Sequence, residues 1–461
     1  MQDNNILPSV QNGAGLPEKV KINGNDSEAL YTTPKKFLFV SLESLSGDLA
    51  WQVRKEGHEV KAYIKAKTDR DVYTGFIDRV DSWEKWQDWA DVIVLDDVGF
   101  GSIADRLRKR SKLVVGGSVY ADRLEIDREF GQTELKKYGV NILPSWNFSD
   151  YDKALEFIRA NPDRYVFKPS GNTPSAGKGL LFMGQEEDGK DLIELIEKNK
   201  VAWQKKAPIF QLQKYINGVE VAVGAFFNGK DFIYPININF EHKRVFPGDI
   251  GPFSGEMGTL MYWSAPNTLF KATLEKMLQP LRESGYVGYI DLNCIVNGRG
   301  IYPLEFTSRF GYPTIQIQSE GITMPSGEWL YRMASGENFE LKVKKGFQVG
   351  VRILVPSYFY KESSAETVKN YRDVAVLFKK PNFEGVHIED IKLSEDGVWR
   401  IAGVSGCVLV VTGSGSTVEE ARRIVYSRIQ NIMIPNMFYR TDIGRGWNND
   451  SDKLQTWGYL Y

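Results

Sequence analysis

Short apolar segments alternate with a helical pattern through the first folded part of the chain, and this alternation limits the fold more than any other feature. The four strand-length apolar segments are Lys36–Ser41, His58–Ile64, Asp91–Leu95 and Lys112–Gly117. Between the first two, Gly47–Glu56 carries apolar residues at helical spacing. Buried strands separated by helices predict a doubly wound parallel sheet. Its ligands would bind at the carboxyl ends of the strands, at the loops Ser41–Asp48 and Asp96–Gly101.

The middle of the chain has a different, antiparallel pattern. Asn217-Gly218 and Asn228-Gly229 are both hairpin signals. The first predicts that a strand at Pro208–Tyr215 pairs with its successor, Val219–Phe227. The second joins that strand to Asp231–Asn239. Further along we expect one helix at Thr268–Ser284, strands at Gln348–Val355 and Trp399–Thr412, and a helix at Thr417–Gln430.

Composition excludes several classes of function. Lys plus Arg is 58 and Asp plus Glu is 59, so a role in coating nucleic acid or a membrane surface is excluded. With two cysteines and three histidines, any metal site must rely on oxygen ligands, which favours hard cations. The first 34 residues are polar and lack the apolar core of a signal peptide, and no apolar run could span a membrane. We therefore expect a polar, flexible tail and a cytoplasmic protein.

A lysine ends the strand Tyr165–Lys168, and a loop rich in glycine, Pro169–Gly179, follows it. Backbone N–H groups of such a loop can approach phosphate oxygens, and Lys178 adds a second cation. The spacing matches neither a Walker loop nor a dinucleotide fingerprint. Taken alone, such a loop is more often a flexible surface turn, and its value as a signal depends on the segments that follow it.

A predicted hairpin carries two acids near its end. Asp291 and Asn293 share one face of the first strand, and Glu305 and Thr307 share one face of the second. A three-residue loop, Gly298–Gly300, with its last glycine in a left-handed bulge position, would bring these four side chains onto one patch, whereas a two-residue loop would scatter them. An all-oxygen patch suits Mg²⁺. The alternative is a solvated sheet face.

Two further segments carry charge. Phe240–Gly258 places three polar or charged residues before a loop with four glycines, which could surround a polar substrate. Ser308–Gly311 follows the acidic strand directly, so Arg309 would lie beside the acids and could neutralise a phosphoryl group.

In this order the segments resemble the ATP-grasp superfamily, and within it the phosphoribosylamine–glycine ligase family. The matching segments are Val166–Leu180, Gln213–Glu220, Glu241–Gly258, Leu304–Pro313 and Tyr439–Gly444. The third is the most specific, because its end parallels the family pattern D-x-G-P-N-T-G-G-M-G. The resemblance implies an α/β and α+β multidomain ATP-grasp fold. Its parts would be a tail (1–34), a Rossmann-like parallel-sheet domain (35–145), an ATP-grasp domain (146–345, with a small ATP lid at about 150–215) and a C-terminal closing domain (346–461).

The resemblance also implies a role for individual residues. ATP would be bound by Lys168, Gly177, Lys178, Gly179, Gln213, Tyr215, Ile216 and Glu220. The substrate would be bound by Asp249, Gly251, Ser254, Gly255 and Met257. The metal would be held by Asp291, Glu305 and Thr307, and the catalytic residues would be Lys243 and Arg309.

In this family ATP phosphorylates a carboxylate, and an amine then attacks the acyl phosphate. The resemblance therefore implies ATP and Mg²⁺ as cofactors, or Mn²⁺ in place of Mg²⁺, and a small-molecule carboxylate and amine as partners. Phosphoribosylamine and glycine are the default pair. Nucleic acid and membrane are not expected as partners, and the oligomeric state is left open.

The chain departs from the family pattern mainly on the side of the amine. Ser41–Leu49 lacks the arginine and histidine of the family's first loop, and Cys407 stands in place of a later arginine. Thr307 replaces a metal-binding Asn, Tyr312 replaces an Asp, and Phe253 begins the replacement of an Asn-Thr pair. Two alternatives follow. One is a ligase that joins a different amino acid to another amine or a modified nucleotide. The other is a catalytically weak nucleotide-binding scaffold.

Overall fold

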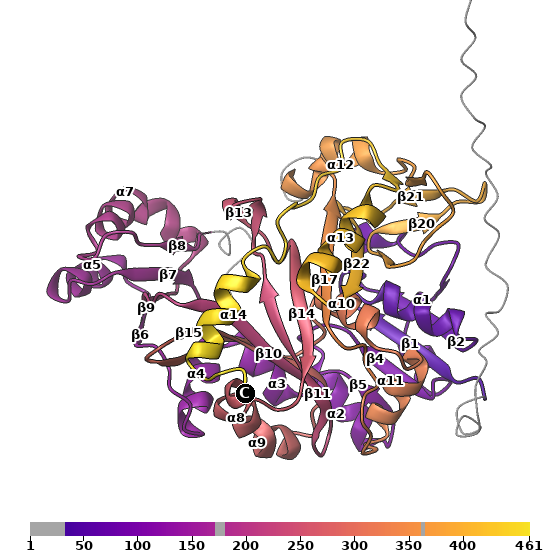
Figure 1. Ribbon diagram of the computed structural model, residues 1–461, viewed down its shortest axis with the longest axis horizontal. Helices are drawn as coiled ribbons and strands as arrows, with labels where there is room; N and C mark the ends of the chain where they lie inside the picture. Colours follow the sequence, from indigo (N-terminus) through magenta and orange to yellow (C-terminus); the bar gives the residue numbers. More distant parts are fainter. Residues whose placement is uncertain (1–32, 171–179, 361–364) are drawn as a thin grey trace, which may run out of the picture.

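The computed structural model describes residues 33–170, 180–360 and 365–461 (Figure 1). Gly177, Lys178 and Gly179, predicted to bind ATP, lie outside the described residues, as does almost all of the predicted tail. Among the described residues, none of the helices has the length and apolar character needed to cross a membrane.

The N-terminal part contains a five-stranded parallel sheet, as the alternating pattern predicts. Its strands, in the order β3-β2-β1-β4-β5, are β3 (Asp78–Arg79), β2 (Glu59–Ile64), β1 (Lys36–Ser41), β4 (Val92–Leu95) and β5 (Leu113–Val115). The central strands β1 and β4 are almost wholly buried, which explains their continuous apolar sequences. The helices of this part are α1 (Gly47–Lys55), α2 (Gly101–Lys109), α3 (Val119–Ile126) and α4 (Arg128–Lys137).

A small four-stranded antiparallel sheet forms a lid that projects from one side of the molecule (Figure 1). Its strands, in order, are β6 (Ser145–Phe148), β9 (Phe210–Lys214), β7 (Tyr165–Pro169) and β8 (Phe182–Met183), and its helices are α5 (Tyr151–Ala160) and α7 (Lys190–Lys206). The lid has an apolar core of its own, in which Tyr151, Phe167, Phe210 and Trp203 pack together.

The predicted hairpin at Asn217-Gly218 is wrong. Strand β9 pairs with β6 and β7, whereas the following strand, β10 (Val219–Asn228), pairs with β11 and β15 of another sheet. The two strands bury their apolar side chains in different cores, so the chain crosses from the lid to the central sheet at this point. The side-chain amide of Asn297 donates to the carbonyl of Asn217 (2.9 Å) and ties the connection to the central sheet.

The central sheet has eight antiparallel strands in the order β16-β15-β10-β11-β14-β17-β22-β19. Besides β10, they are β11 (Phe232–Glu241), β14 (Gly258–Ser264), β15 (Val287–Asn297), β16 (Gly300–Thr307), β17 (Phe347–Leu354), β19 (Val386–Ile388) and β22 (Cys407–Gly415). The turn at Asn228-Gly229 joins β10 to β11 as predicted. The C-terminal strands β17, β22 and β19 extend this sheet instead of forming one of their own (Figure 1).

The hairpin β15–β16 brings the predicted residues face to face, but by a different route. Its turn has two residues, and Gly300 is a strand residue without a left-handed conformation, so the predicted three-residue loop is wrong. A bulge at Leu304 supplies the extra residue, since Cys294 pairs with Pro303 and the next residue, Asn293, pairs with Glu305. Asp291 consequently faces Thr307 as predicted.

Two long elements predicted from the sequence are interrupted. The helix expected over 268–284 is divided into α8 (Thr268–Ala272), a 3-10 turn (Leu274–Met277) and α9 (Leu278–Glu283), because Thr273 has a non-helical backbone. The strand expected over 399–412 is divided into β21 (Trp399–Ile401) and β22, with Gly403 and Gly406 at positive φ between them. Helix α13 (Val418–Ile429) begins as predicted, since the side chain of Thr417 accepts a hydrogen bond from the backbone N–H of Glu420.

The remaining elements are short. They are β12 (Arg244–Phe246), β13 (Ile250–Phe253), α10 (Thr314–Gly321), α11 (Ser326–Ala334), a 3-10 turn at Pro356–Tyr360, α12 (Ala365–Tyr371), β18 (Leu377–Phe378), β20 (Ile391–Leu393), β23 (Ile432–Met433) and α14 (Trp447–Thr456).

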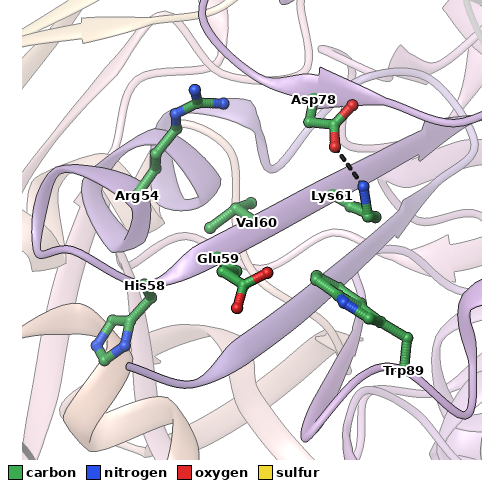
Figure 2. Close-up of a pocket in the computed structure, with 7 residues that line it drawn as sticks. All are labelled: Arg54, His58, Glu59, Val60, Lys61, Asp78 and Trp89. Atoms are coloured by element: carbon green, nitrogen blue, oxygen red, sulfur yellow. Dashed lines mark hydrogen bonds and ion pairs between the residues drawn. The ribbon is translucent and has the colours of Figure 1, made fainter. Parts of the chain in front are cut away.

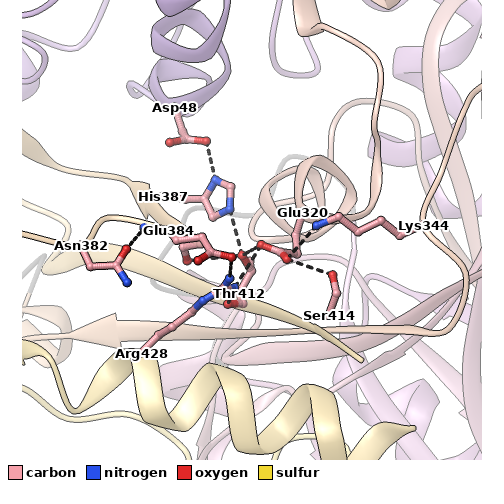
Figure 3. Close-up of polar contacts among 10 residues, drawn as sticks. Asp48, Glu320, Lys344, Asn382, Glu384, His387, Thr412, Ser414 and Arg428 are labelled. Atoms are coloured by element: carbon pink, nitrogen blue, oxygen red, sulfur yellow. Dashed lines mark hydrogen bonds and ion pairs between the residues drawn. The ribbon is translucent and has the colours of Figure 1, made fainter. Parts of the chain in front are cut away.

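A buried polar network joins the N-terminal part to the C-terminal strands (Figure 3). The carboxylate of Asp48, at the start of α1, is 2.7 Å from Nδ1 of His387 and accepts a bond from the N–H of Ile388 (3.1 Å). The other ring nitrogen of His387 lies 3.0 Å from the hydroxyl of Thr412, which donates to Glu320 (2.9 Å). The network thus fixes α1 against β19 and β22.

Candidate active site

A cleft of about 1360 Å³ lies between the lid, the hairpin β15–β16 and the glycine-rich segment before β14. Helices α3 and α4 of the N-terminal part complete its wall with Glu125 and Arg128. Eight of the residues predicted from the sequence line this cleft: Lys168, Lys243, Ser254, Gly255, Asp291, Glu305, Thr307 and Arg309. The structure therefore brings together predicted residues from the lid, the glycine-rich segment, the hairpin β15–β16 and the segment that follows it.

Lys168 ends strand β7 and reaches from the lid into the cleft. Its ammonium group donates to the side-chain oxygen of Gln213 (2.7 Å). Burial, together with the nearby cation Arg128, lowers the pKa of Lys168 to about 8. Lys168 therefore has too little negative charge around it, and a phosphate group would supply that charge.

Lys243 stands among three carboxylates. Its Nζ lies 3.5 Å from Glu220, 3.3 Å from Glu241 and 3.4 Å from Glu305. Burial by itself would lower the pKa of Lys243, but the three carboxylates raise it well above its ordinary value. Lys243 thus remains a fixed positive charge between the acids of the hairpin and those of β10 and β11.

Glu305 is held as a carboxylate by two cations. One oxygen lies 2.9 Å from the guanidinium of Arg128, and the other is the oxygen that contacts Lys243. Burial would raise the pKa of Glu305, but Arg128 and Lys243 outweigh that effect and lower the pKa to about 2. Glu305 is therefore ionised at any physiological pH and can serve as a metal ligand.

Asp291, unlike Glu305, is an acid that has too little positive charge around it. It is 1% exposed, and its Oδ1 has no hydrogen-bond partner among the described residues. Burial and the nearby Glu241 raise the pKa of Asp291 well above its ordinary value. A bound cation would supply the missing partner for this buried carboxylate oxygen at the cleft.

The acids of the hairpin fit a hard divalent cation. Asp291, Glu305 and Thr307 offer only oxygen donors, and one of those oxygens is unpartnered. Within the part of the chain that the structure describes, no three His, Cys, Asp or Glu side chains already form a metal cluster. The protein would therefore supply two carboxylates, and substrate phosphates the other ligands, as is common for Mg²⁺.

Arg309 follows β16 and is fixed in the cleft wall by two acids. Its Nε lies 3.0 Å from Asp97, which follows β4, and 3.2 Å from Glu125 of α3. Burial would lower the pKa of Arg309, but these carboxylates raise it above its ordinary value. The predicted proximity of Arg309 to the acids is thus present, and the N-terminal part positions it.

The structure places the remaining predicted residues away from the cleft lining. Met257 is buried in a small apolar cluster with Val245 and Leu354. Asp249 is exposed and pairs with Arg440 (2.6 Å). Four further predicted residues do not line the cleft themselves but each contacts a residue that does: Gly251, Gln213, Tyr215 and Glu220. Ile216 lies beside Tyr215 in the connection between the lid and the central sheet.

Several charged residues of the cleft were not predicted from the sequence, among them Arg128, Glu241 and Glu256. Arg128 begins helix α4 and pairs with Glu305, but no motif surrounds it. Glu241 ends β11 and accepts from the amide of Asn293 (3.0 Å). Glu256 lies inside the glycine-rich segment, where an acid among glycines is the signal that could have revealed it.

A second, smaller cavity lies on the outer part of the N-terminal sheet (Figure 2). Its volume is about 270 Å³, and Arg54, His58 and Trp89 are among its lining residues. Lys61 pairs with Asp78 at this place and lies 4.0 Å from the ring centre of Trp86. None of the residues predicted to act in catalysis or binding lines this cavity.

Comparisons with known proteins show that the chain has an ATP-grasp fold. Residues 126–315 match the family model described as the ATP-grasp (A) domain of phosphoribosylglycinamide synthetase. The chain is similar to phosphoribosylamine–glycine ligases: it is 27% identical to the one from Listeria monocytogenes serotype 4b (strain F2365) over 74% of this chain and 80% of that protein. It is 26% identical to the one from Streptococcus pneumoniae (strain ATCC BAA-255 / R6) over 76% and 82%.

Solved structures agree on the fold. The phosphoribosylamine–glycine ligase of Thermotoga maritima superimposes with a TM-score of 0.64 at 21% identity, covering 89% of this chain and all of that one (100%). A biotin carboxylase from Campylobacter jejuni, solved with an ATP analogue, superimposes with a TM-score of 0.60 at 13% identity, covering 92% and 97%. At these identities the likeness establishes the ATP-grasp fold alone.

Proposed function

We propose that this chain is an ADP-forming ligase that uses ATP to join a carboxylate to an amine through an acyl phosphate. One observation supports this above all. A single cleft is lined by Lys168 and Asp291, whose charged forms burial disfavours, and by the ion pair of Lys243 with Glu305. A nucleotide phosphate together with a divalent cation would satisfy both Lys168 and Asp291.

The cations of the cleft would act on the charge that moves with the transferred phosphoryl group. Lys168 would bind a phosphate oxygen from the lid side, and Lys243 and Arg309 would face the new acyl phosphate. A divalent cation held by Asp291 and Glu305 would supply Lewis-acid stabilisation of the phosphates. The lid would exclude water, which would otherwise hydrolyse the acyl phosphate.

We propose phosphoribosylamine and glycine as the default substrates and Mg²⁺ as the metal, with Mn²⁺ as its substitute. The curated relatives that match over 74% to 76% of this chain are named for that substrate pair. The all-oxygen donor set of the hairpin supports a hard cation.

A different amine is the second candidate, and one observation favours it. At the carboxyl ends of β1 and β4, where the family pattern has an arginine, Ser44 donates to Asp390 (3.0 Å) and Ser46 donates to Asp96 (2.7 Å). Asp96 and Asp390 are buried, and burial raises the pKa of each to about 7. A phosphate placed beside these acids would be repelled once they ionise.

Release of ADP from ATP, glycine and an amine tests the proposal. The full chain should release ADP only when both glycine and phosphoribosylamine, or another amine of a panel, are supplied. Glu305→Ala should abolish this release, whereas Glu419→Ala, on the exposed face of α13, should not change it. ATP binding without turnover across the panel would favour the scaffold alternative, and turnover only with amines lacking phosphate would exclude phosphoribosylamine.

A further inference from the structure

Glu256 is a buried acid of the cleft that takes no part in the proposed binding of ATP, metal or substrate. It is 6% exposed, and it lines the same cavity as Lys243 and Asp291. It lies at the end of the glycine-rich segment, beside Ser254 and Gly255 and close to the start of β14. In the pattern D-x-G-P-N-T-G-G-M-G this position holds glycine, so the carboxylate is an addition of this chain.

The groups around Glu256 leave its carboxyl without a cation of its own. Thr259 of β14 donates its hydroxyl to Oε1, and the negative charge of Glu241 on β11 acts against a charge on Glu256. On β17, Arg352 is occupied by a two-point pair with Glu389 (3.0 and 2.7 Å) and donates only to the main-chain oxygen of Glu256 (3.1 Å).

The second nearby cation, Lys243, is likewise held by other carboxylates. Burial and Glu241 therefore raise the pKa of Glu256 to about 8, although Thr259, Arg352 and Lys243 each oppose the rise. Such a carboxyl exchanges its proton near neutral pH, which is the property that a general base requires.

The position of Glu256 separates it from the groups that would hold the nucleotide. Lys168 reaches the cleft from the lid, and Glu305 reaches it from β16. Glu256 comes instead from the wall formed by the glycine-rich segment, next to Tyr358 of the C-terminal part. An acyl phosphate formed between these groups would have Glu256 on a different wall of the cavity from Lys168.

We propose that Glu256 accepts the proton that the attacking amine gives up as the amide forms. This inference rests on the proposed ligase function. The nitrogen lone pair forms the carbon–nitrogen bond, the bond from the acyl carbon to the phosphate oxygen breaks, and phosphate leaves with that electron pair. The extra proton on nitrogen passes to a carboxylate oxygen of Glu256 and then to solvent.

The experiment compares two nucleophiles in the full-length protein. Glycine and ATP are supplied with either the amine that supports ADP release or hydroxylamine, whose adduct loses its proton to water readily because hydroxylamine is weakly basic. With the amine, Glu256→Gln should lower amide formation by about 10²- to 10⁴-fold, the usual contribution of a general base. Hydroxamate formation by the same variant should stay within about threefold of wild type, since phosphoryl transfer does not need this group.

Two measurements exclude a merely structural effect. Amide formation by the wild type should rise by roughly tenfold between pH 7 and 9, as Glu256 ionises, and this rise should be absent from Glu256→Gln. Glu256→Asp should restore part of the rate, and Glu419→Gln should behave as wild type. The thermal unfolding temperature of Glu256→Gln should be no lower than that of wild type, because the amide cannot ionise when buried.

Equal loss of both products in Glu256→Gln would overturn the inference, because it would place the residue in phosphoryl transfer or in the fold. Retention of both products would overturn it as well. A wild-type protein that forms no hydroxamate from ATP and any of the twenty amino acids would instead contradict the ligase function, and the inference would fall with it.

Discussion

Burial disfavours the charged form of each cleft residue, and neighbouring charges decide whether that effect is outweighed. Lys168 and Glu305 are both removed from water, yet the pKa of Lys168 falls to about 8 and that of Glu305 falls to about 2. Arg128 and Lys243 disfavour a further positive charge on the lysine, whereas the same two cations favour the negative charge of the glutamate. The phosphates of a nucleotide would be stabilised where these three cations lie close together.

The pH dependence of ATP binding should report on Lys168. In the free protein this lysine loses its proton as the pH rises through about 8, and only its protonated form attracts phosphate. Affinity for ATP should therefore fall as the pH rises from 7 to 9, by up to about tenfold per pH unit for one coupled proton. Titration calorimetry at several pH values measures this.

Lys168→Met should bind ATP more weakly at pH 7 and lose the pH dependence. Lys205→Met, on the exposed side of α7, should keep both the affinity and the dependence of wild type. An unchanged pH profile in Lys168→Met would show that another group titrates.

Asp291→Asn should separate stability from activity. The pKa of Asp291 is raised in the folded protein, so its carboxyl group destabilises the folded state at pH values above the ordinary carboxyl pKa. The neutral amide of the variant should therefore leave the unfolding temperature equal or higher. ADP release that depends on Mg²⁺ should fall by at least about 100-fold, as expected for a lost metal ligand. Thermal unfolding without metal and an ADP assay with it measure the two effects, and lower stability with full activity would contradict the assignment.

At the scale of elements, the bulge at Leu304 decides how the hairpin presents its acids. Pro303 and Glu305 pair with adjacent residues of β15, so Leu304 is the residue without a partner. The side-chain amide of Gln132 in α4 donates to the carbonyls of Pro303 and Leu304 (3.3 and 3.1 Å), which satisfies backbone groups that the bulge removes from the ladder. A short turn plus a bulge thus replaces the longer turn expected from the glycines.

Changes of chain length at the bulge should have opposite outcomes. Deletion of Leu304 should keep Asn293 opposite Glu305, because the flanking pairs already follow one another, and ADP release should stay within about tenfold of wild type. An alanine inserted between Leu304 and Glu305 should turn Glu305 and Thr307 to the other face and lower ADP release by at least about 100-fold. Circular dichroism would confirm that both variants fold, and equal activities would contradict the register argument.

At the scale of the molecule, distant parts of the chain share one sheet and one cleft. The C-terminal strands continue the central sheet, and the network around Asp48 and His387 fixes the N-terminal helix α1 against them (Figure 3). The lid, by contrast, has its own apolar core and joins the central sheet through a short connection (Figure 1). The cleft wall outside the lid is therefore built from the N-terminal, central and C-terminal parts together.

Asp48→Ala should weaken this contact. It removes the acceptor of the bonds from His387 and Ile388 in a buried place, which should cost about 1–3 kcal/mol of unfolding free energy. Burial would raise the pKa of Asp48, but His387 and Ile388 lower it overall, so its contribution is present at neutral pH and is lost as the pH falls through the lowered pKa. Urea unfolding at pH 7 measures the loss, which should shrink at acid pH; Asp452→Ala, at an exposed site, should show none.

Local sequence patterns were sufficient to predict the elements that depend on residues close together in the chain. Apolar runs marked β1, β2, β4 and β5, and alternation placed Asp291 with Asn293 on one face of β15 and Glu305 with Thr307 on one face of β16. Lys168, Lys243 and Arg309 could also be identified, since each adjoins a segment with a recognisable pattern.

Only the tertiary structure decided which strands pair and which charges meet. The turn signal at Asn217-Gly218 depends on neighbouring residues only. Strands β9 and β10 nevertheless pair with different partners, because their side chains pack into two separate apolar cores. Arg128 and Glu256 reach the cleft from a helix and a loop distant in sequence from the acids of the hairpin. Burial and neighbouring charge set the pKa of Glu256, and neither can be read from a chain before it folds, because both arise from contacts between distant segments.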